Sequence, residues 1–502
     1  MINNVNNIND KNLPPICGNE FVINKTVNME KVNRQLKNKS YLENINSGFA
    51  CALHMHQPTI PAGENGGLIS HLQYMFEHTS EGDNHNAEPF AQCYKRLAEI
   101  IPSLINGGYE PKIMLDYSGN LLWGIEQMGR EDIISSLKVL TCNKNVYPCV
   151  EWLGTFWSHA VASSTPPTDF KLQITAWQHH FAALFGEDAL LRVKGFSLPE
   201  MHLPNHPDVL FKLIKALKES GYRWIMVQEH SVENLDGSSL RDDQKYIPNI
   251  LRAKGSNGDT ISILSLIKTQ GSDSKLVGQM QPYYEAIGLS KQNLGNHYIP
   301  TLVSQIADGE NGGVMMNEFP QAFIQAHKRI GPTKDTHTTI AMNASEYLNL
   351  LETLNVDEES YPLIQAINQY KIWDKISVPT TPTTLEKAID ELKNEDHSFS
   401  LSGASWTNEL SWEEGYKNIL ELISKLSSYF HETFDNSVLE NPLVTKTRIY
   451  REALIYLLIL ETSCFRYWGQ GKWTEYARTI YEKGNEVLRK VEGSKDISKN
   501  VM

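Results

Sequence analysis

The 502-residue sequence has few cysteines and no long apolar run. Its longest apolar stretch, residues 453–460, is far shorter than the roughly 20 residues that a membrane-spanning helix needs. The N-terminus is polar and rich in asparagine, so it lacks the apolar segment of a secretory signal peptide. We therefore expect a cytoplasmic protein that does not bind a membrane.

The six cysteines form no CxxC pair, and their spacing matches no zinc signature. Without a sign of secretion, we expect the thiols to be reduced. Basic residues are also in the minority, since 46 lysines and arginines oppose 59 aspartates and glutamates, which gives a net charge of −13. A nucleic-acid-binding protein needs a basic surface that displaces counterions, so this balance argues against a nucleic-acid partner.

Strand and helix patterns alternate over most of the chain. The clearest unit is an apolar run at 193–198, an amphipathic helix at 207–220 and an apolar run at 224–227. Strand, helix and strand in this order form a parallel βαβ unit. Further strands are predicted at 48–53, 112–115, 261–267, 301–307 and 313–316. We predict an α/β fold, a parallel sheet or barrel with its functional residues at the carboxyl ends of the strands.

The composition changes on both sides of this region. Residues 1–45 are dominated by Asn and Lys and predict a disordered tail. Residues 378–384, with the sequence VPTTPTT, predict a linker, and helical patterns follow at 385–392, 414–429 and 445–467. We therefore expect a tail (1–45), an α/β catalytic domain (46–380) and a helical domain (381–495).

Two carboxylates follow separate predicted strands. Glu200 follows the run at 193–198 with only Pro199 between them, and Asp308 follows the run at 301–307. Parallel strands would bring both to one rim, where one carboxylate can attack an anomeric carbon and the other can protonate the leaving oxygen. Alternatively, each carboxylate caps the helix that follows it.

Two histidines follow the first predicted strand. Because alternate residues of a strand point to the same face, His54 and His56 can meet one ligand. With Asp116, which follows the second strand, they could hold a metal ion. They could instead donate hydrogen bonds to sugar hydroxyls, or lie in a loop without a role.

Several stretches, taken together, resemble motifs of glycoside hydrolase family 57. The segment His54-Met55-His56-Gln57-Pro58 resembles the opening motif of the family, and residues 150–156 (VEWLGTF) resemble the second. Residues 195–200 (GFSLPE) resemble the third, whose glutamate is the catalytic nucleophile, and residues 308–310 (DGE) the fourth, whose aspartate is the general acid/base. Residues 461–468 (ETSCFRYW) lie where the fifth is expected, so the motifs occur in order along nearly the whole chain.

The resemblance implies a (β/α)7 barrel with a C-terminal helical domain, and retaining action on α-glucans or malto-oligosaccharides without a metal or another cofactor. It makes Glu200 the nucleophile and Asp308 the acid/base. The expected substrate-binding residues are His54, His56, Gln57, Asp116, Glu151, Trp157, His159, Ser197 and Trp468. Trp406 and Trp412 are further candidates for stacking on sugar rings.

One departure from the family pattern concerns Ser197, which stands where the family usually has a tryptophan two residues before the Pro-Glu step. We therefore expect the sugar contacts beside Glu200 to differ from those of other members. Known members include α-amylases, 4-α-glucanotransferases and glycogen branching enzymes, and the sequence leaves this choice open. Two other classes also stay open: a metal-dependent carbohydrate deacetylase and a non-catalytic glucan-binding protein. The sequence does not indicate an oligomeric state.

Overall fold

The structure is a computed structural model of the chain. It describes residues 13–29, 44–269, 274–310, 318–330, 338–376, 379–401, 417–467 and 471–493. The predicted strand at 313–316 and the residues Trp406, Trp412 and Trp468 lie outside the described residues. In the described part of the chain, no helix is long and apolar enough to cross a membrane.

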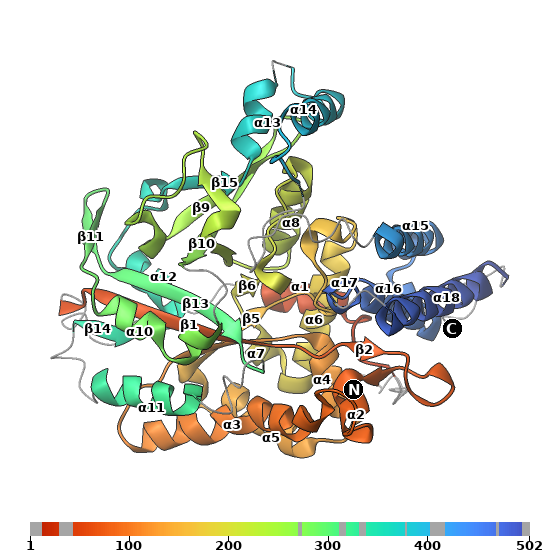
Figure 1. Ribbon diagram of the computed structural model, residues 1–502, viewed down its shortest axis with the longest axis horizontal. Coiled ribbons are helices and arrows are strands. Elements are labelled where there is room, and N and C mark those ends of the chain that lie inside the picture. Colours follow the sequence, from red (N-terminus) through yellow and green to blue (C-terminus); the bar gives the residue numbers. More distant parts are fainter. Residues whose placement is uncertain are drawn as a thin grey trace, which may run out of the picture.

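Parallel strands close into a seven-stranded barrel (Figure 1). In spatial order they are β13 (Thr301–Asp308), β1 (Ser47–Met55), β4 (Ile113–Tyr117), β5 (Val150–Gly154), β6 (Gly195–Ser197), β7 (Trp224–Gln228) and β10 (Thr260–Lys268). Each strand pairs in parallel with the next, and Lys268 pairs with Ser304 to join β10 to β13 and close the ring. The predicted (β/α)7 barrel is confirmed.

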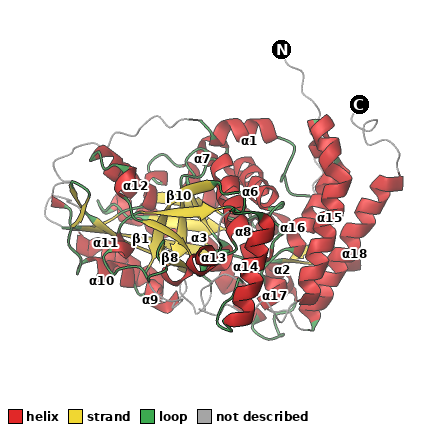
Figure 2. Cartoon of the chain, turned by 90° about the horizontal axis from the view of Figure 1, so that it is seen from above, coloured by secondary structure: helices red, strands yellow, loops and turns green. Residues whose placement is uncertain are grey.

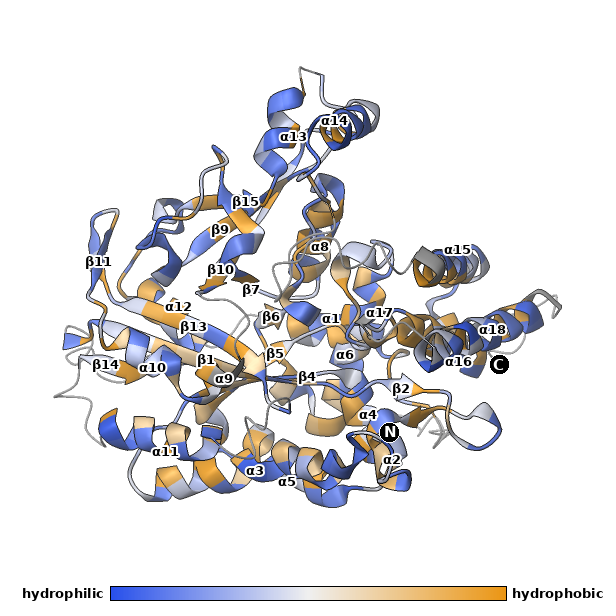
Figure 3. Ribbon diagram, viewed as in Figure 1, coloured by the Kyte–Doolittle hydropathy of each residue, from blue (hydrophilic) through white to orange (hydrophobic). Residues whose placement is uncertain are grey.

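Helices connect these strands and cover the outside of the barrel. They are α2 (His71–Glu77), α3 (Ala87–Asn106), α4 (Gly119–Gln127), α5 (Glu131–Cys142), α6 (Phe170–Phe185), α7 (Glu187–Leu190), α8 (Pro207–Glu219), α9 (Ser274–Gly278), α10 (Gln281–Ala286), α11 (Phe319–Ile330) and α12 (Ala344–Thr353). Helix α8 shows how the sequence directs this packing. It begins at the predicted Pro207, whose missing N–H is not needed in the first turn, and buries Leu210, Leu213 and Leu217. Figure 3 shows the same division into apolar and polar faces on α3 and α5.

The barrel interior is filled by small and medium apolar side chains. Ala50 and Ala52 of β1 lie in one buried cluster with Met114, Leu266 and Ile306 from other strands. Small residues on β1 leave room for the larger side chains opposite, because protein interiors pack to high density. The barrel interior is therefore a packed core, and the polar functional side chains are expected at the carboxyl ends of the strands.

The sheet continues beyond β10. Strand β9 (Asn249–Lys254) pairs antiparallel with β10, β15 (Leu363–Ala366) pairs with β9, and β8 (Val232–Asn234) pairs with β15. Strand β14 (Thr339–Ala341) pairs with the start of β1, and two short hairpins are formed by β2 (Thr59–Ile60) with β3 (Ile69–Ser70) and by β11 (Gln292–Leu294) with β12 (His297–Ile299). Strands β9 and β15 of this extension lie on the side of the barrel away from the C-terminal helices (Figure 1).

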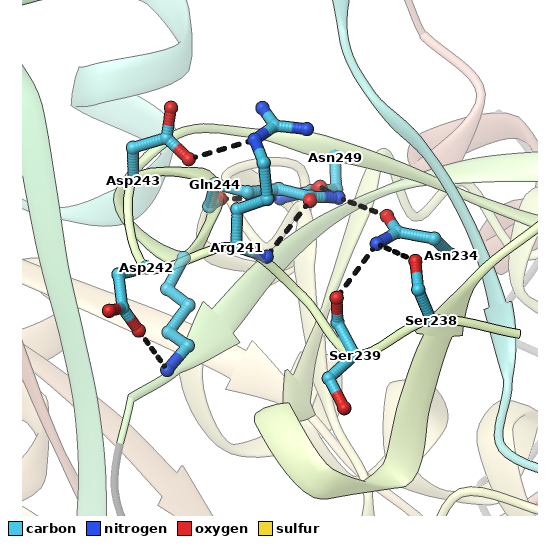
Figure 4. Close-up of polar contacts among 9 residues, drawn as sticks. Asn234, Ser238, Ser239, Arg241, Asp242, Asp243, Gln244 and Asn249 are labelled. Atoms are coloured by element: carbon cyan, nitrogen blue, oxygen red, sulfur yellow. Dashed lines mark hydrogen bonds and ion pairs between the residues drawn. The ribbon is translucent and has the colours of Figure 1, made fainter.

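A buried amide network orders the chain between β8 and β9 (Figure 4). The Gln244 side chain donates to Oδ1 of Asn234 at 2.9 Å and to Oδ1 of Asn249 at 3.0 Å. Asn234 in turn donates to Oγ of Ser238 at 3.0 Å and to the carbonyl of Ser239 at 2.9 Å. Buried amides need such partners, so this network fixes the course of the connection.

The C-terminal helices pack against one side of the barrel (Figure 2). They are α15 (Lys417–Glu440), α16 (Arg448–Leu460), α17 (Cys464–Tyr467) and α18 (Lys472–Gly493), and α16 packs on both α15 and α18. The prediction of one helix over 445–467 was wrong. The helix ends at Leu460, and Thr462 instead forms an antiparallel bridge with Ala160 of the barrel.

The structure differs from the predicted tail and linker at two places. Within 1–45, the described residues include α1 (Glu20–Val27), which buries Ile23 and Val27 against the barrel helices. A Cβ at Gly221, where φ is +80°, would lie 2.5 Å from the Val27 carbonyl oxygen, so this glycine permits the close approach. The other domain boundaries stay predictions.

The predicted linker at 378–384 ends in the first turn of α14 (Pro382–Glu395). The Thr381 side chain caps that helix, because its hydroxyl accepts a hydrogen bond from the Thr384 N–H. Helix α14 packs on α13 (Gln369–Lys375) through a small apolar cluster that includes Ile372, Leu385 and Phe399. This pair therefore adjoins the sheet extension (Figure 1).

Candidate active site

Three polar residues lie side by side at the carboxyl ends of adjacent strands. The strand register aligns His54 of β1 with Asp116 of β4 on one side and with Asp308 of β13 on the other. Nδ1 of His54 lies 3.1 Å from Oδ2 of Asp116, and both side chains are buried. Burial works against a charged ring, but the Asp116 charge, with weaker effects of Asp308 and Glu310, raises the pKa of His54 to about 9. His54 is therefore an imidazolium at neutral pH.

Three imidazole rings stack at this rim. The His159 ring contacts both of the others, with its centroid 4.5 Å from that of His54 and 4.2 Å from that of His56 and interplanar angles of 25° and 18°, while the centroids of His54 and His56 are 6.4 Å apart. Burial and the neighbouring rings hold the pKa of His159 and of His56 well below the usual range, so these two rings are neutral. One charged and two neutral rings thus form a rigid wall.

Glu200 follows β6 on a strained turn. Its φ is +58° and that of the next residue, Met201, is +51°, in the left-handed region that non-glycine residues seldom occupy. The Glu200 carboxylate lies 3.7 Å from Nδ1 of His159, and its side chain is 13% exposed whereas that of His159 is 4% exposed. The turn therefore directs a carboxylate from the β6 end toward the stacked rings and leaves it accessible.

The stacked rings connect the two predicted catalytic carboxylates. The Asp308 charge helps to raise the pKa of His54, the His54 ring stacks on that of His159, and His159 lies beside Glu200. The strand-end positions of Asp308 and Glu200 are therefore on the same rim, as the sequence analysis expected.

Glu310 is a member of this site that the sequence analysis did not assign. Tyr94 of α3 donates its hydroxyl hydrogen bond to Oε1 of Glu310, and the His56 N–H points to Oε2 at 3.4 Å. Burial, reinforced by the Asp308 charge, raises the pKa of Glu310 to about 8. Its place in the motif DGE, two residues after Asp308, was the only sequence signal for it.

Two residues of the C-terminal region also reach the site. Oγ of Ser463 lies 2.8 Å from Nδ1 of His159, and Sγ of Cys464 lies 3.4 Å from Nε2 of His56. Both belong to the stretch that resembles the fifth family motif, where the sequence predicted a substrate contact by the aromatic Trp468. Burial raises the pKa of Cys464 to about 12, so this thiol is protonated at neutral pH.

Two of the predicted substrate contacts have partners within the fold. The Glu151 carboxylate accepts hydrogen bonds from the backbone N–H and the hydroxyl of Ser345, so it caps α12 at the amino end of β5. Trp157 is fully buried, and its indole donates to Nδ1 of His180 at 3.2 Å. Glu151 thus helps to fix α12, and Trp157 is held among buried side chains. Substrate contact by these two residues stays a prediction.

Gln57 and Ser197, two further expected substrate contacts, lie at or just after the ends of strands. Gln57 follows β1 at the rim, and its Oε1 lies 3.3 Å from Nδ1 of His71. Ser197 ends β6, and its buried hydroxyl has no hydrogen-bond partner among the described residues. Substrate contact by Gln57, Ser197 and Trp468 stays a prediction.

The contacts of the His56 ring nitrogens argue against a metal ion held by His54, His56 and Asp116. His56 uses both nitrogens, since Nδ1 lies 2.7 Å from the Ser118 hydroxyl and Nε2 faces Cys464. A metal ligand needs a free lone pair on one of them. Among the described residues, no three His, Cys, Asp or Glu side chains are grouped as a metal site requires. The residues present therefore do not fit a metal held by His54, His56 and Asp116.

Residues 22–265 match the family model of glycosyl hydrolase family 57. These residues belong to that family. The matched range contains the stacked histidines and Glu200 but ends before Asp308, Ser463 and Cys464.

Solved structures share the fold of this chain. The 4-α-glucanotransferase from Thermococcus litoralis is 18% identical with a TM-score of 0.53, and the match covers 89% of this chain and 60% of that one. The GH57-type branching enzyme from Pyrococcus horikoshii is 13% identical with a TM-score of 0.51, over 91% of this chain and 96% of that one. The chain thus spans about 60% of the length of the first relative and nearly all of the second. No curated protein sequence matches this chain.

Proposed function

We propose that this protein is a cytoplasmic retaining enzyme that acts on α-1,4-glucans such as starch, glycogen or maltodextrin. The observation that carries the proposal is the rim itself, where Glu200 and Asp308 are connected through the stacked rings of His159 and His54. The match of residues 22–265 to family 57 supports it further. The resemblance of residues 195–200 to the third family motif implies that Glu200 is the nucleophile.

The reaction proceeds by double displacement. Glu200 attacks the anomeric carbon as the nucleophile while Asp308, as the general acid, donates a proton to the departing glycosidic oxygen. A covalent bond forms between the sugar and the Glu200 carboxylate as the C–O bond to the leaving group breaks. Asp308 then takes a proton from an acceptor hydroxyl, which attacks the same carbon and releases Glu200.

The chemistry suits the charge distribution of the rim. The imidazolium of His54 and its partner Asp116 form a buried ion pair beside Asp308. Neutral His56 and His159 present ring edges and faces to a neutral sugar without adding charge. An uncharged polysaccharide also agrees with the acidic net charge of the chain, which would repel a polyanion.

The acceptor decides between hydrolysis and transfer. Water would make the protein an amylase, whereas a sugar hydroxyl would make it a glucanotransferase or a branching enzyme, as the two structural neighbours are described. Product analysis after incubation with maltoheptaose and with amylose separates the three. Shorter oligomers alone indicate hydrolysis, a ladder longer than the input indicates transfer, and new α-1,6 linkages indicate branching.

The carboxylate pair is tested by Glu200→Gln and Asp308→Asn. We expect each to lower turnover of an α-1,4-glucan by at least about a thousandfold, because each removes an essential nucleophile or proton donor. Glu219→Gln, on the exposed surface of α8, is the matched control and should retain wild-type turnover. Near-normal turnover in either site variant would overturn the assignment, and so would a β-configured first product seen by NMR.

The two competing classes predict different results. A metal-dependent deacetylase would lose activity during dialysis against a chelator, whereas we expect unchanged glucan turnover. A non-catalytic glucan-binding protein would bind glycogen without cleaving or transferring any linkage. Either result, obtained with folded wild-type protein, would replace the proposal.

A further inference from the structure

The break between α16 and α17 brings a segment of the C-terminal region into the catalytic rim. Thr462 forms an antiparallel bridge with Ala160, Ser463 contacts His159, and Cys464 contacts His56. Thr462, Ser463 and Cys464 are all buried. This segment lies outside the range that matches the family, and it was expected to supply aromatic surfaces rather than hydroxyl groups.

Ser463 holds His159 at two points. Its backbone N–H donates to the His159 carbonyl at 3.0 Å, and its hydroxyl lies 2.8 Å from Nδ1 of the His159 ring. His159 itself has a φ of +61°, a conformation that costs free energy in a residue other than glycine. Such a conformation persists only where the surroundings impose it, and the contacts with Ser463 are part of those surroundings.

The Ser463 hydroxyl fixes the orientation of the His159 ring in a way that stacking alone does not. Contact with the rings of His54 and His56 fixes the plane of the His159 ring, but a 180° turn about its Cβ–Cγ bond would keep that plane and exchange its Nδ1 and Cδ2 edges. A hydrogen bond at Nδ1 fixes which edge of the ring faces outward. That edge is the one that Glu200 approaches, with its Oε1 3.7 Å from Nδ1.

We propose that Ser463 is a positioning residue for the nucleophile: by fixing the edge of the His159 ring, it sets the place of the Glu200 carboxylate. The proposal rests on the proposed function, in which Glu200 is the nucleophile. The hydroxyl suits this task because it can serve a neutral ring as donor or as acceptor without adding a charge beside Glu200. The C-terminal region is then part of the catalytic machinery and not only a cover for the barrel.

The test compares Ser463→Ala with Ser463→Thr, which keeps the hydroxyl. Because a misplaced reacting group commonly costs up to about a hundredfold in rate, we expect Ser463→Ala to lower kcat about 10- to 100-fold and to change KM by less than about threefold. Ser463→Thr should recover most of that loss. Ser427→Ala, a buried serine on α15, is the matched control and should keep the wild-type kcat.

A double-mutant cycle distinguishes a positioning role of Ser463 from a general effect on the structure. If Ser463 acts through His159, the variant with both Ser463→Ala and His159→Gln will be no slower than His159→Gln alone, within about twofold. Melting temperatures are measured for every variant, and the cycle also covers the case in which the added methyl group of Ser463→Thr does not fit.

Three results would overturn the positioning role. They are a wild-type kcat in Ser463→Ala, losses that multiply in the double variant, and an equal loss in Ser427→Ala. Glu200→Gln separates this failure from that of the proposed function. An inactive Glu200→Gln with a normal Ser463→Ala overturns only the positioning role, whereas an active Glu200→Gln overturns the proposed function itself.

Discussion

Three residues at the catalytic rim, His159, Glu200 and Met201, have a strained left-handed backbone conformation. Glu200 and His159 both have positive φ values, and their side chains face each other. A left-handed non-glycine residue costs on the order of 1 kcal/mol or more, which packing elsewhere must offset. The fold accepts this cost where it directs a carboxylate and an imidazole to one point.

The loop that carries His159 depends on a close contact at Gly119. A Cβ there would lie 2.0 Å from Cδ1 of Trp157, and the Asn120 N–H donates to the Trp157 carbonyl at 3.1 Å. We expect Gly119→Ala to destabilise the protein by about 1–3 kcal/mol, because the buried indole has no room to move. The loss is measured as a lower melting temperature and reduced glucan turnover.

Gly288→Ala is the matched control for that substitution. The nearest atom to a Cβ at Gly288 is the Glu285 carbonyl oxygen at 3.5 Å, which is ordinary contact. Equal melting temperatures for the two variants would show that Trp157 yields to the added methyl group.

At the scale of elements, buried polar contacts join the C-terminal helices to the barrel. Gln173 of α6 donates to the Glu461 carboxylate at 2.6 Å and to the Ser158 hydroxyl at 2.8 Å. Helix α15 is joined to the N-terminus of α6, where Nε2 of His431 lies 2.5 Å from Oδ1 of Asp169. Since buried polar groups need partners, these contacts fix where the helices lie on the barrel.

The His431 contact makes the docking of α15 sensitive to pH. Burial opposes the charge, but hydrogen bonds to Asp169 and Asp435 raise the pKa of His431 to about 9. A raised folded-state pKa gives stabilisation that is fully present below the ordinary value of 6.5 and is lost as the pH rises through about 9. We expect His431→Gln to cost about 1.5–3 kcal/mol at pH 6 and much less at pH 10.

The measurement is the difference in melting temperature between wild type and His431→Gln across that pH range. His397→Gln is the control, because His397 is exposed and its replacement should give no pH-dependent difference. A difference that stays constant from pH 6 to pH 10 would contradict the assignment of the charge to His431.

At the scale of the whole molecule, the barrel surround and the C-terminal helices share one apolar core. A single buried cluster includes Phe170 and Phe181 of α6, Phe434 of α15 and Ile455 of α16. Val27 of α1 belongs to the same cluster, although it lies within the segment that the sequence predicted as a tail. Regions that share a core this way lose each other's packing when either unfolds.

We therefore expect the barrel and the C-terminal helices to unfold together. Heating followed by tryptophan fluorescence and by far-ultraviolet circular dichroism should give coincident transitions, and calorimetry should give one main peak. Two well-separated peaks, or a helical transition that precedes the loss of tryptophan burial, would show that the helices are an independent domain.

Six of the seven barrel strands, all except β5, were predicted from the sequence, together with the class of the fold and the polar residues that follow the strands. These follow from local rules: apolar runs of strand length, a helix with one apolar face and carboxylates or histidines directly after a strand. Glu200, Asp308, His54, His56 and Asp116 were therefore found without a structure, because a strand end fixes where its next residue lies.

The partners of individual side chains became visible only in the tertiary structure. Glu151 stands in a stretch that resembles a family motif and Trp157 directly follows that stretch, yet one caps α12 and the other packs beside Gly119. Glu310 and Ser463 enter through contacts with Tyr94 and His159, from which each is more than 200 residues away in sequence. Such contacts depend on barrel closure and on the break after α16, and neither local periodicity nor residue spacing encodes the meeting of segments so far apart.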